Sequence, residues 1–84
     1  MKNKILINLY VTSLDENYEI FIPTNESIKK VVDLIVKSVF DLSDGVLDLT
    51  PHYYLIDPIK SEIYIESSIV RDTNLENGKK VILI

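Results

Sequence analysis

The sequence predicts an α+β fold in which one helix packs across one face of a mixed sheet of four to five strands. Apolar and polar residues alternate with the period of a β-strand near the start of the chain, and an apolar run of strand type closes it. Between them lies a single segment whose apolar residues recur with the period of an α-helix. With 84 residues, no linker and no internal repeat, the chain is expected to form one domain over residues 1–84.

The first two strands are expected at residues 4–12 and 18–22, and they should form a hairpin. Turn-forming polar residues occupy the link at residues 13–17. Pro23 should end the second strand, since it has no N–H group to donate to the sheet. Alternation places the apolar side chains of both strands on one face. They are Ile5, Ile7, Leu9, Val11, Tyr18, Ile20 and Ile22.

An amphipathic helix is expected from Ile28 to about Phe40. Asn25 and Ser27 are both suitable N-cap residues, because a short polar side chain can accept from the free N–H groups of the first turn. The apolar residues follow the helical spacing of three and four and are Ile28, Val31, Val32, Ile35, Val36 and Val39. All are β-branched and therefore weak helix formers, but their spacing fits a helix far better than a strand.

Three further strands are expected in the second half, at residues 53–56, 62–66 and 79–84. Residues 46–52 link the helix to this half and have room for one short helical turn, whereas residues 67–78 form a loop with at most one such turn. The first and last strands of the chain are strongly apolar, which suits central positions in a mixed sheet. This order of elements is that of a β-grasp fold.

Two details of this half concern single residues. Gly78 is expected to adopt a positive φ in the turn before the last strand. Within residues 62–66, alternation puts Tyr64 on one face and Ile63 and Ile65 on the other. The pattern alone leaves open which of these faces points inward.

Composition and spacing argue against catalysis and against bound cofactors or metals. The chain has no cysteine, and its one histidine, His52, lies in an expected loop with no nucleophile beside it. Asp41, Asp44 and Asp48 lack the alternate spacing and the closing glutamate of a calcium loop, so a solvated loop is the simpler interpretation. The net charge of −4 and the scattered basic residues argue against nucleic acid. The apolar runs are too short for membrane insertion.

The candidate functional surface is the face of the sheet opposite the helix. If the apolar face of the hairpin packs on the helix, alternation directs five other apolar residues outward, namely Leu6, Tyr10, Phe21, Ile82 and Ile84. A monomer seldom exposes a contiguous apolar patch of this kind without use. The residues leave three alternatives for it: a protein partner, self-association, and a loop that covers the face.

The chain resembles ubiquitin over nearly its whole length. The resemblance rests on core and turn positions of matching type and spacing, which are Ile20, Ile22, Pro23, Ile28, Val31, Ile35, Val70, Asp72, Asn74, Leu75, Val81 and Leu83. It implies the ubiquitin-like β-grasp fold. Ubiquitin carries a reactive glycine pair after its last strand, whereas no glycine pair follows Leu83 here. Conjugation to targets is therefore not expected.

Among ubiquitin-like proteins without that tail, the chain is most similar to the small bacterial YukD/EsaB-like group, which accompanies type VII (WXG100) secretion systems. The shared features are an apolar-Pro step that ends residues 18–23, an Ile-Lys-Lys helix start within residues 27–30, and the apolar strand within residues 77–84. The resemblance implies a cytoplasmic, non-catalytic accessory or regulator of such a system, with protein partners among its membrane components. The alternative is a general ubiquitin-like adaptor or self-associating module unrelated to secretion.

Overall fold

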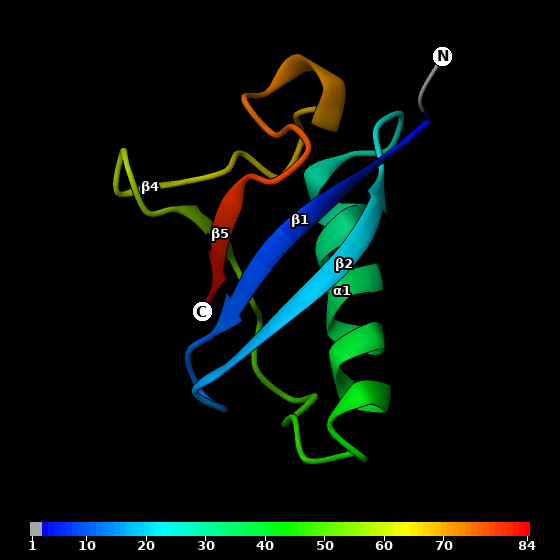
Figure 1. Ribbon diagram of the computed structural model, residues 1–84, viewed down its shortest axis with the longest axis vertical. Coiled ribbons are helices and arrows are strands. Elements are labelled where there is room, and N and C mark those ends of the chain that lie inside the picture. The colour runs from blue at the N-terminus through cyan, green and yellow to red at the C-terminus, as the bar shows by residue number, and fades with distance from the viewer. Residues whose placement is uncertain (1–2) are drawn as a thin grey trace.

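The computed structural model describes residues 3–84 as a five-stranded sheet that curves around one helix (Figure 1). The strands are β1 (Lys4–Val11), β2 (Glu16–Pro23), β3 (Leu55–Asp57), β4 (Glu62–Ile63) and β5 (Lys80–Leu83), and the helix is α1 (Ile28–Leu42). The strand order is β2-β1-β5-β3-β4, with β1 and β5 parallel and all other pairs antiparallel. The predicted α+β fold with one helix across a mixed sheet is confirmed, and the first and last strands are central.

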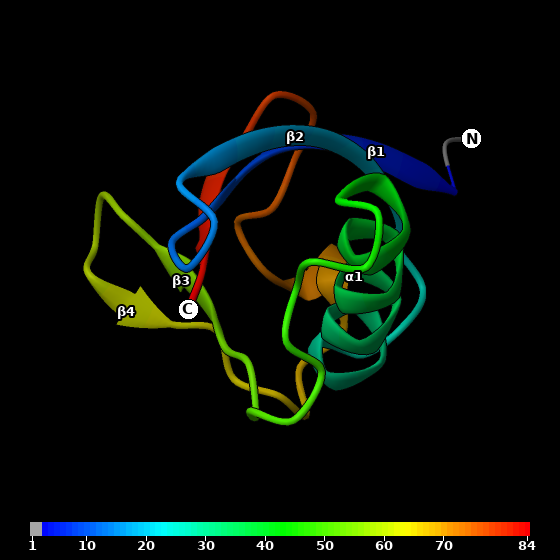
Figure 2. The same cartoon turned by 90° about the horizontal axis from the view of Figure 1, so that it is seen from below.

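The core lies between α1 and the concave face of the sheet (Figure 2). The odd-numbered residues of β1 from Ile5 to Val11 are buried, and Ile20 and Ile22 of β2 join them. From the helix, the predicted apolar stripe is buried except for the half-buried Val36. The alternating apolar residues of the strands and the apolar stripe of the helix thus pack together in one layer, as their periods predict.

Side-chain and backbone hydrogen bonds define both ends of α1. Ser27 is the N-cap, because its hydroxyl oxygen accepts from the backbone N–H of Lys30 at 3.2 Å. The helix ends at Leu42, two residues after the expected Phe40. Ser43 is the C-cap, and Asp44 and Gly45 after it adopt positive φ values of 55° and 79°. There the N–H of Gly45 donates to the carbonyl of Phe40 at 2.8 Å.

The strands of the second half are shorter than expected. β3 starts at Leu55 rather than residue 53, and β4 contains two residues rather than the five of 62–66. After β4 the N–H of Tyr64 still donates to the carbonyl of Leu55 at 2.9 Å, and its side chain points inward, where its hydroxyl donates to Asn74 Oδ1 at 2.6 Å. Residues 46–52 form no helix, whereas the loop over residues 67–78 contains one helical turn, which the sequence allowed, the 3-10 helix η1 (Val70–Asp72).

Asp57 is the one buried polar or charged residue among residues 3–84, and it ties three segments together. Its carboxylate accepts from Asn74 Nδ2 at 2.8 Å, from Lys79 Nζ at 3.2 Å and from the backbone N–H of Ile59 at 3.0 Å. The hydrogen bond from Asn74 is the main cause that lowers the pKa of Asp57 to about 2, against the opposing effect of burial. The network joins the β3–β4 turn to the loop that leads into β5.

The turn before β5 depends on Gly78, whose φ is +83°, as predicted. A Cβ at this position would meet no other atom within 4 Å, so a substitution should cost only the left-handed backbone conformation. We expect Gly78→Ala to lower the free energy of unfolding by about 1 kcal/mol, measured by urea denaturation. Gly78→Asn should lose less, because asparagine tolerates this conformation. Equal stability of Gly78→Ala and the parent protein would contradict the turn geometry.

Candidate protein-binding surface

The outer face of the sheet, directed away from α1, carries apolar residues in cross-strand register. Tyr10 of β1 lies opposite Ile82 of β5, Ile82 lies opposite Ile56 of β3, and Ile56 lies opposite Ile63 of β4. These residues alternate with the buried ones and form one row across four strands. Cross-strand neighbours in such a row have their Cβ atoms about 5 Å apart, so the row is continuous.

A second pair extends the row along the strands. Ile84 and Tyr54 exchange two backbone hydrogen bonds of 3.0 and 2.8 Å, two residues beyond Ile82 and Ile56. Ile63 is 54% exposed and Ile84 is 53% exposed. We call the combined surface the outer-face patch; it comprises Tyr10, Tyr54, Ile56, Ile63, Ile82 and Ile84. No loop among residues 3–84 covers Ile63 or Ile84.

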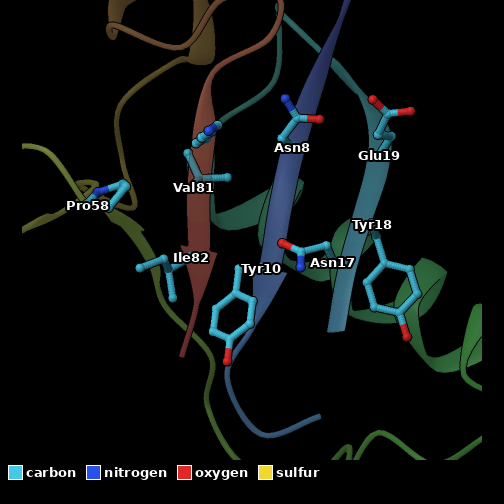
Figure 3. Close-up of a pocket in the computed structure, with 9 residues that line it drawn as sticks. Asn8, Tyr10, Asn17, Tyr18, Glu19, Pro58, Val81 and Ile82 are labelled. Atoms are coloured by element: carbon cyan, nitrogen blue, oxygen red, sulfur yellow. The ribbon is translucent and has the colours of Figure 1, made fainter. Parts of the chain in front are cut away.

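A shallow depression of about 460 Å³ adjoins the patch (Figure 3). Its floor includes Tyr10 and Ile82, which point toward the viewer in Figure 3 with α1 behind the sheet. Pro58 of the β3–β4 turn borders one side, and Asn8 and Glu19 lie toward the other end. The surface therefore combines an apolar row with a concave region beside it, which is a shape that a protruding apolar side chain of a partner fits.

Two of the five predicted surface residues are separated from the others. Leu6 and Phe21 lie opposite each other on β1 and β2. Between this pair and Tyr10 lies Asn8, which is paired with Glu19 on one side and with Lys80 on the other. This polar belt interrupts the contiguous patch that alternation alone predicts.

Tyr10, Ile82 and Ile84 come together as predicted, but sequence reasoning missed Tyr54, Ile56 and Ile63. A signal was present for each. Tyr54 and Ile56 alternate with the buried Tyr53 and Leu55, and Ile63 takes the outward side once Tyr64 is turned inward. What the pattern lacks is the register that places these residues beside β5.

Tyr10 is held in place by its hydroxyl, which donates to Asp15 Oδ1 at 2.6 Å. This hydrogen bond is the main cause that raises the pKa of Tyr10. Because Asp15 lies in the turn between β1 and β2, the ring is tied to the end of the hairpin. One edge of the outer-face patch is therefore positioned before any partner arrives, which lowers the entropic cost of binding.

The other polar residues considered as sites have local roles. His52 Nε2 lies 2.7 Å from Glu66 Oε2, and its ring meets that of Tyr54 edge-on, with centroids 4.7 Å apart. Asp48 accepts from the backbone N–H and the hydroxyl of Thr50, both at 2.9 Å. Residues 3–84 contain no cluster of three His, Cys, Asp or Glu side chains that could hold a metal ion. No helix within the same residues has the length and apolar character needed to cross a bilayer.

Comparison with solved structures identifies the fold. The ubiquitin-like domain of the Mycobacterium tuberculosis type VII secretion system protein EccD1 matches with a TM-score of 0.76 and 13% identity, over 100% of this chain and 99% of that chain. A chain of the MycP5-free ESX-5 inner membrane complex matches with a TM-score of 0.81 and 9% identity, over 99% of this chain and 21% of that chain. A chain of the toluene 4-monooxygenase HD complex matches with a TM-score of 0.77 and 8% identity, over 95% of each chain.

The protein therefore has a ubiquitin-like β-grasp fold, as the resemblance to ubiquitin implies. No protein-family model and no curated protein matches the sequence. At these identities the structural likeness carries the fold alone, and the matched proteins themselves differ in role.

Proposed function

We propose that this protein is a non-catalytic ubiquitin-like interaction domain that binds a protein partner through the outer-face patch. The observation that carries the proposal is the apolar row from Tyr10 to Ile63, which crosses four strands in register and is open at Ile63. A protein of this size seldom leaves such a row in water, because exposed apolar area favours association. Aromatic and apolar residues surrounded by polar ones form the usual centre of a protein interface.

For the partner, we propose a component of a type VII secretion apparatus, with the protein acting as a cytoplasmic accessory or regulator of the YukD/EsaB-like kind. Two observations support this assignment. The sequence motifs of residues 18–23, 27–30 and 77–84 resemble that group, and a ubiquitin-like domain of a type VII secretion protein matches nearly end to end. The match to a chain of an inner membrane complex favours membrane components of the apparatus as partners.

The second candidate function is that of a general adaptor or self-associating module. Ile63 favours it, because this residue lies on the two-residue edge strand β4, where a second copy could place its own sheet edge alongside. Self-association along β4 would also involve Ile63, so Ile63→Glu should weaken it as well. The two functions differ in what the protein captures.

Capture from a detergent-solubilised lysate of a bacterium with a type VII system tests the proposal. The parent protein should retain secretion-apparatus components, and Ile63→Glu/Ile84→Glu should lose about nine-tenths or more of them, since each charge enters a desolvated interface. Leu34→Glu is the matched control, because Leu34 is an exposed apolar residue on α1. Phe21→Glu should cost less than the double variant, because the polar belt separates Phe21 from the patch.

The outcomes separate the candidates. Capture of the same apparatus components by Ile63→Glu/Ile84→Glu and by the parent protein would remove the outer-face patch from the proposal. Suppose that the parent protein captures no apparatus component but forms a concentration-dependent dimer in sedimentation velocity. Loss of this dimer in Ile63→Glu/Ile84→Glu would favour the self-associating module.

A further inference from the structure

The charges of α1 oppose its own dipole at both ends. The first turn contains Lys29 and Lys30 and no acidic residue, and the last turn contains Asp41 and no basic residue. The amino end of a helix carries partial positive charge and the carboxyl end partial negative charge, so each arrangement is the less stable one. Where a fold keeps charges that reduce its own stability, function is a reason to look for.

At the carboxyl end of α1 the acidic character extends beyond the helix. The turn between β1 and β2 lies at the same end of the molecule (Figure 1), and it contributes Asp15 and Glu16. Asp44 follows the helix directly, and all these carboxylates are exposed. The nearest basic residue of the helix, Lys37, borders a separate depression together with Asp41. This end of the molecule is therefore a negative surface.

An apolar notch of about 310 Å³ lies within this negative surface, between the β1–β2 turn and the end of α1. Leu14 and Tyr18 form one wall and also pack on the core. Leu42 and Val46 form the other wall and are 60% and 68% exposed. Glu16 and Asp44 also line the notch, so apolar walls and carboxylates belong to one concavity.

The exposure of Val46 is built into the backbone. The Ser43 hydroxyl donates to the carbonyl of Phe40 and accepts from the N–H of Leu47, both at 3.2 Å. Leu47 itself is buried in the core. The hydrogen bonds of Ser43 and Leu47 thus hold Val46 outward. The notch is formed before a partner binds, which lowers the entropic cost of binding.

We propose that this notch is a second docking site, separate from the outer-face patch, for a cationic amphipathic segment of a partner protein. An apolar side chain of the segment would enter between Leu14 and Leu42, and lysine or arginine residues on either side would pair with Glu16 and Asp44, the two carboxylates that line the notch. Charge complementarity selects this occupant, because an acidic or neutral segment would leave the carboxylates unpaired beside an apolar contact. The carboxylate of Asp44, placed beside the negative end of α1, then has a function.

Two synthetic peptides with the same helical spacing of leucines, one with lysine and one with glutamate at the remaining positions, test the proposal by NMR titration of the ¹⁵N-labelled protein. The lysine peptide should shift the amide signals of Leu14, Leu42 and Val46, and its affinity should fall with added salt. Leu42→Ser/Val46→Ser should weaken binding by about tenfold or more. The glutamate peptide should not bind.

A second variant keeps the test independent of folding damage. Glu16→Gln/Asp44→Asn should also weaken binding of the lysine peptide by about tenfold, while its melting temperature stays close to that of the parent protein, because both carboxylates are exposed. Ile63→Glu is the control and should bind the peptide like the parent protein.

Four results would overturn the proposal: equal binding of both peptides, unchanged affinity of Leu42→Ser/Val46→Ser, shifts centred on Tyr10 and Ile82, or no binding of the lysine peptide. A concentration-dependent dimer of the parent protein that Glu16→Gln/Asp44→Asn abolishes would replace the partner segment by a second copy and would overturn it as well.

Discussion

Ile35→Asp should abolish the cooperative folding of this domain. Ile35 has no exposed surface and lies at the centre of the apolar stripe of α1. A carboxylate at this position would be buried with no partner, which costs about 4 kcal/mol or more. A domain of this length has a total stability of about 4 to 12 kcal/mol. We therefore expect far-UV circular dichroism to show no cooperative thermal transition.

Two variants control for effects other than burial of charge. Leu34→Asp introduces the same side chain at the adjacent position, which is 40% exposed, and should remain folded with a loss of about 1 kcal/mol or less. Ile35→Ala leaves a cavity without a charge and should lose about 3 kcal/mol. A native melting curve for Ile35→Asp would show that α1 does not bury this face against the sheet.

Asp57→Asn should destabilise the domain and remove part of its sensitivity to acid. The carboxylate of Asp57 accepts from Asn74, Lys79 and the backbone of Ile59, whereas an amide can offer only one acceptor atom to these donors. The ammonium group of Lys79 would then lack its counter-charge at 13% side-chain exposure. We expect a lower midpoint in urea at neutral pH and a turn between β3 and β4 that opens earlier in hydrogen exchange.

The pH dependence of this effect follows from the lowered pKa. The pKa of Asp57 is about 2 in the folded protein and 3.8 is the ordinary value, so the unfolded chain takes up the proton first as the pH falls. The stabilisation is complete above about pH 4 and is lost between about pH 4 and pH 2. The parent protein and Asp57→Asn should therefore approach each other in melting temperature over this range.

Glu66→Gln provides the comparison for the acid experiment, because Glu66 pairs with His52 at an exposed position. It should follow the parent protein through the acid range. Hydrogen bonds from Thr50 also lower the pKa of Asp48. This contribution to acid sensitivity is the same in the parent protein, Asp57→Asn and Glu66→Gln. A constant difference in melting temperature between Asp57→Asn and the parent protein from pH 7 to pH 2 would contradict the assignment.

The sequence was most informative where one local period decided the structure. β1 and α1 were predicted to within two residues at each end, because alternation and the three-four spacing are properties of neighbouring residues. β3 and β4 were predicted too long, since their limits depend on contacts between distant residues. Tyr64 turns inward toward Asn74, and Asp57 is held by Lys79, 22 residues further along the chain.

The candidate surface was likewise predicted only in part. Alternation correctly directed Tyr10 and Ile82 outward, but only the register between strands shows that Ile56 and Ile63 continue their row and that Asn8 separates them from Phe21. The pattern of apolar residues did not predict the notch at the end of α1. It forms where Val46 follows two residues of positive φ, and single-sequence reasoning cannot foresee that geometry.

The parallel pairing of β1 with β5 also governs how the chain folds. The backbone N–H of Leu6 donates to Asn77 Oδ1 across 71 positions of sequence, and Asn8 lies opposite Lys80. The centre of the sheet is therefore completed by segments from opposite halves of the chain, and closing so long a loop precedes the gain from the contact. During synthesis, the β1–β2 hairpin and α1 leave the ribosome with the edge of β1 that faces β5 unpaired until β5 emerges. Until then, that edge of β1 is available for strand pairing with another chain.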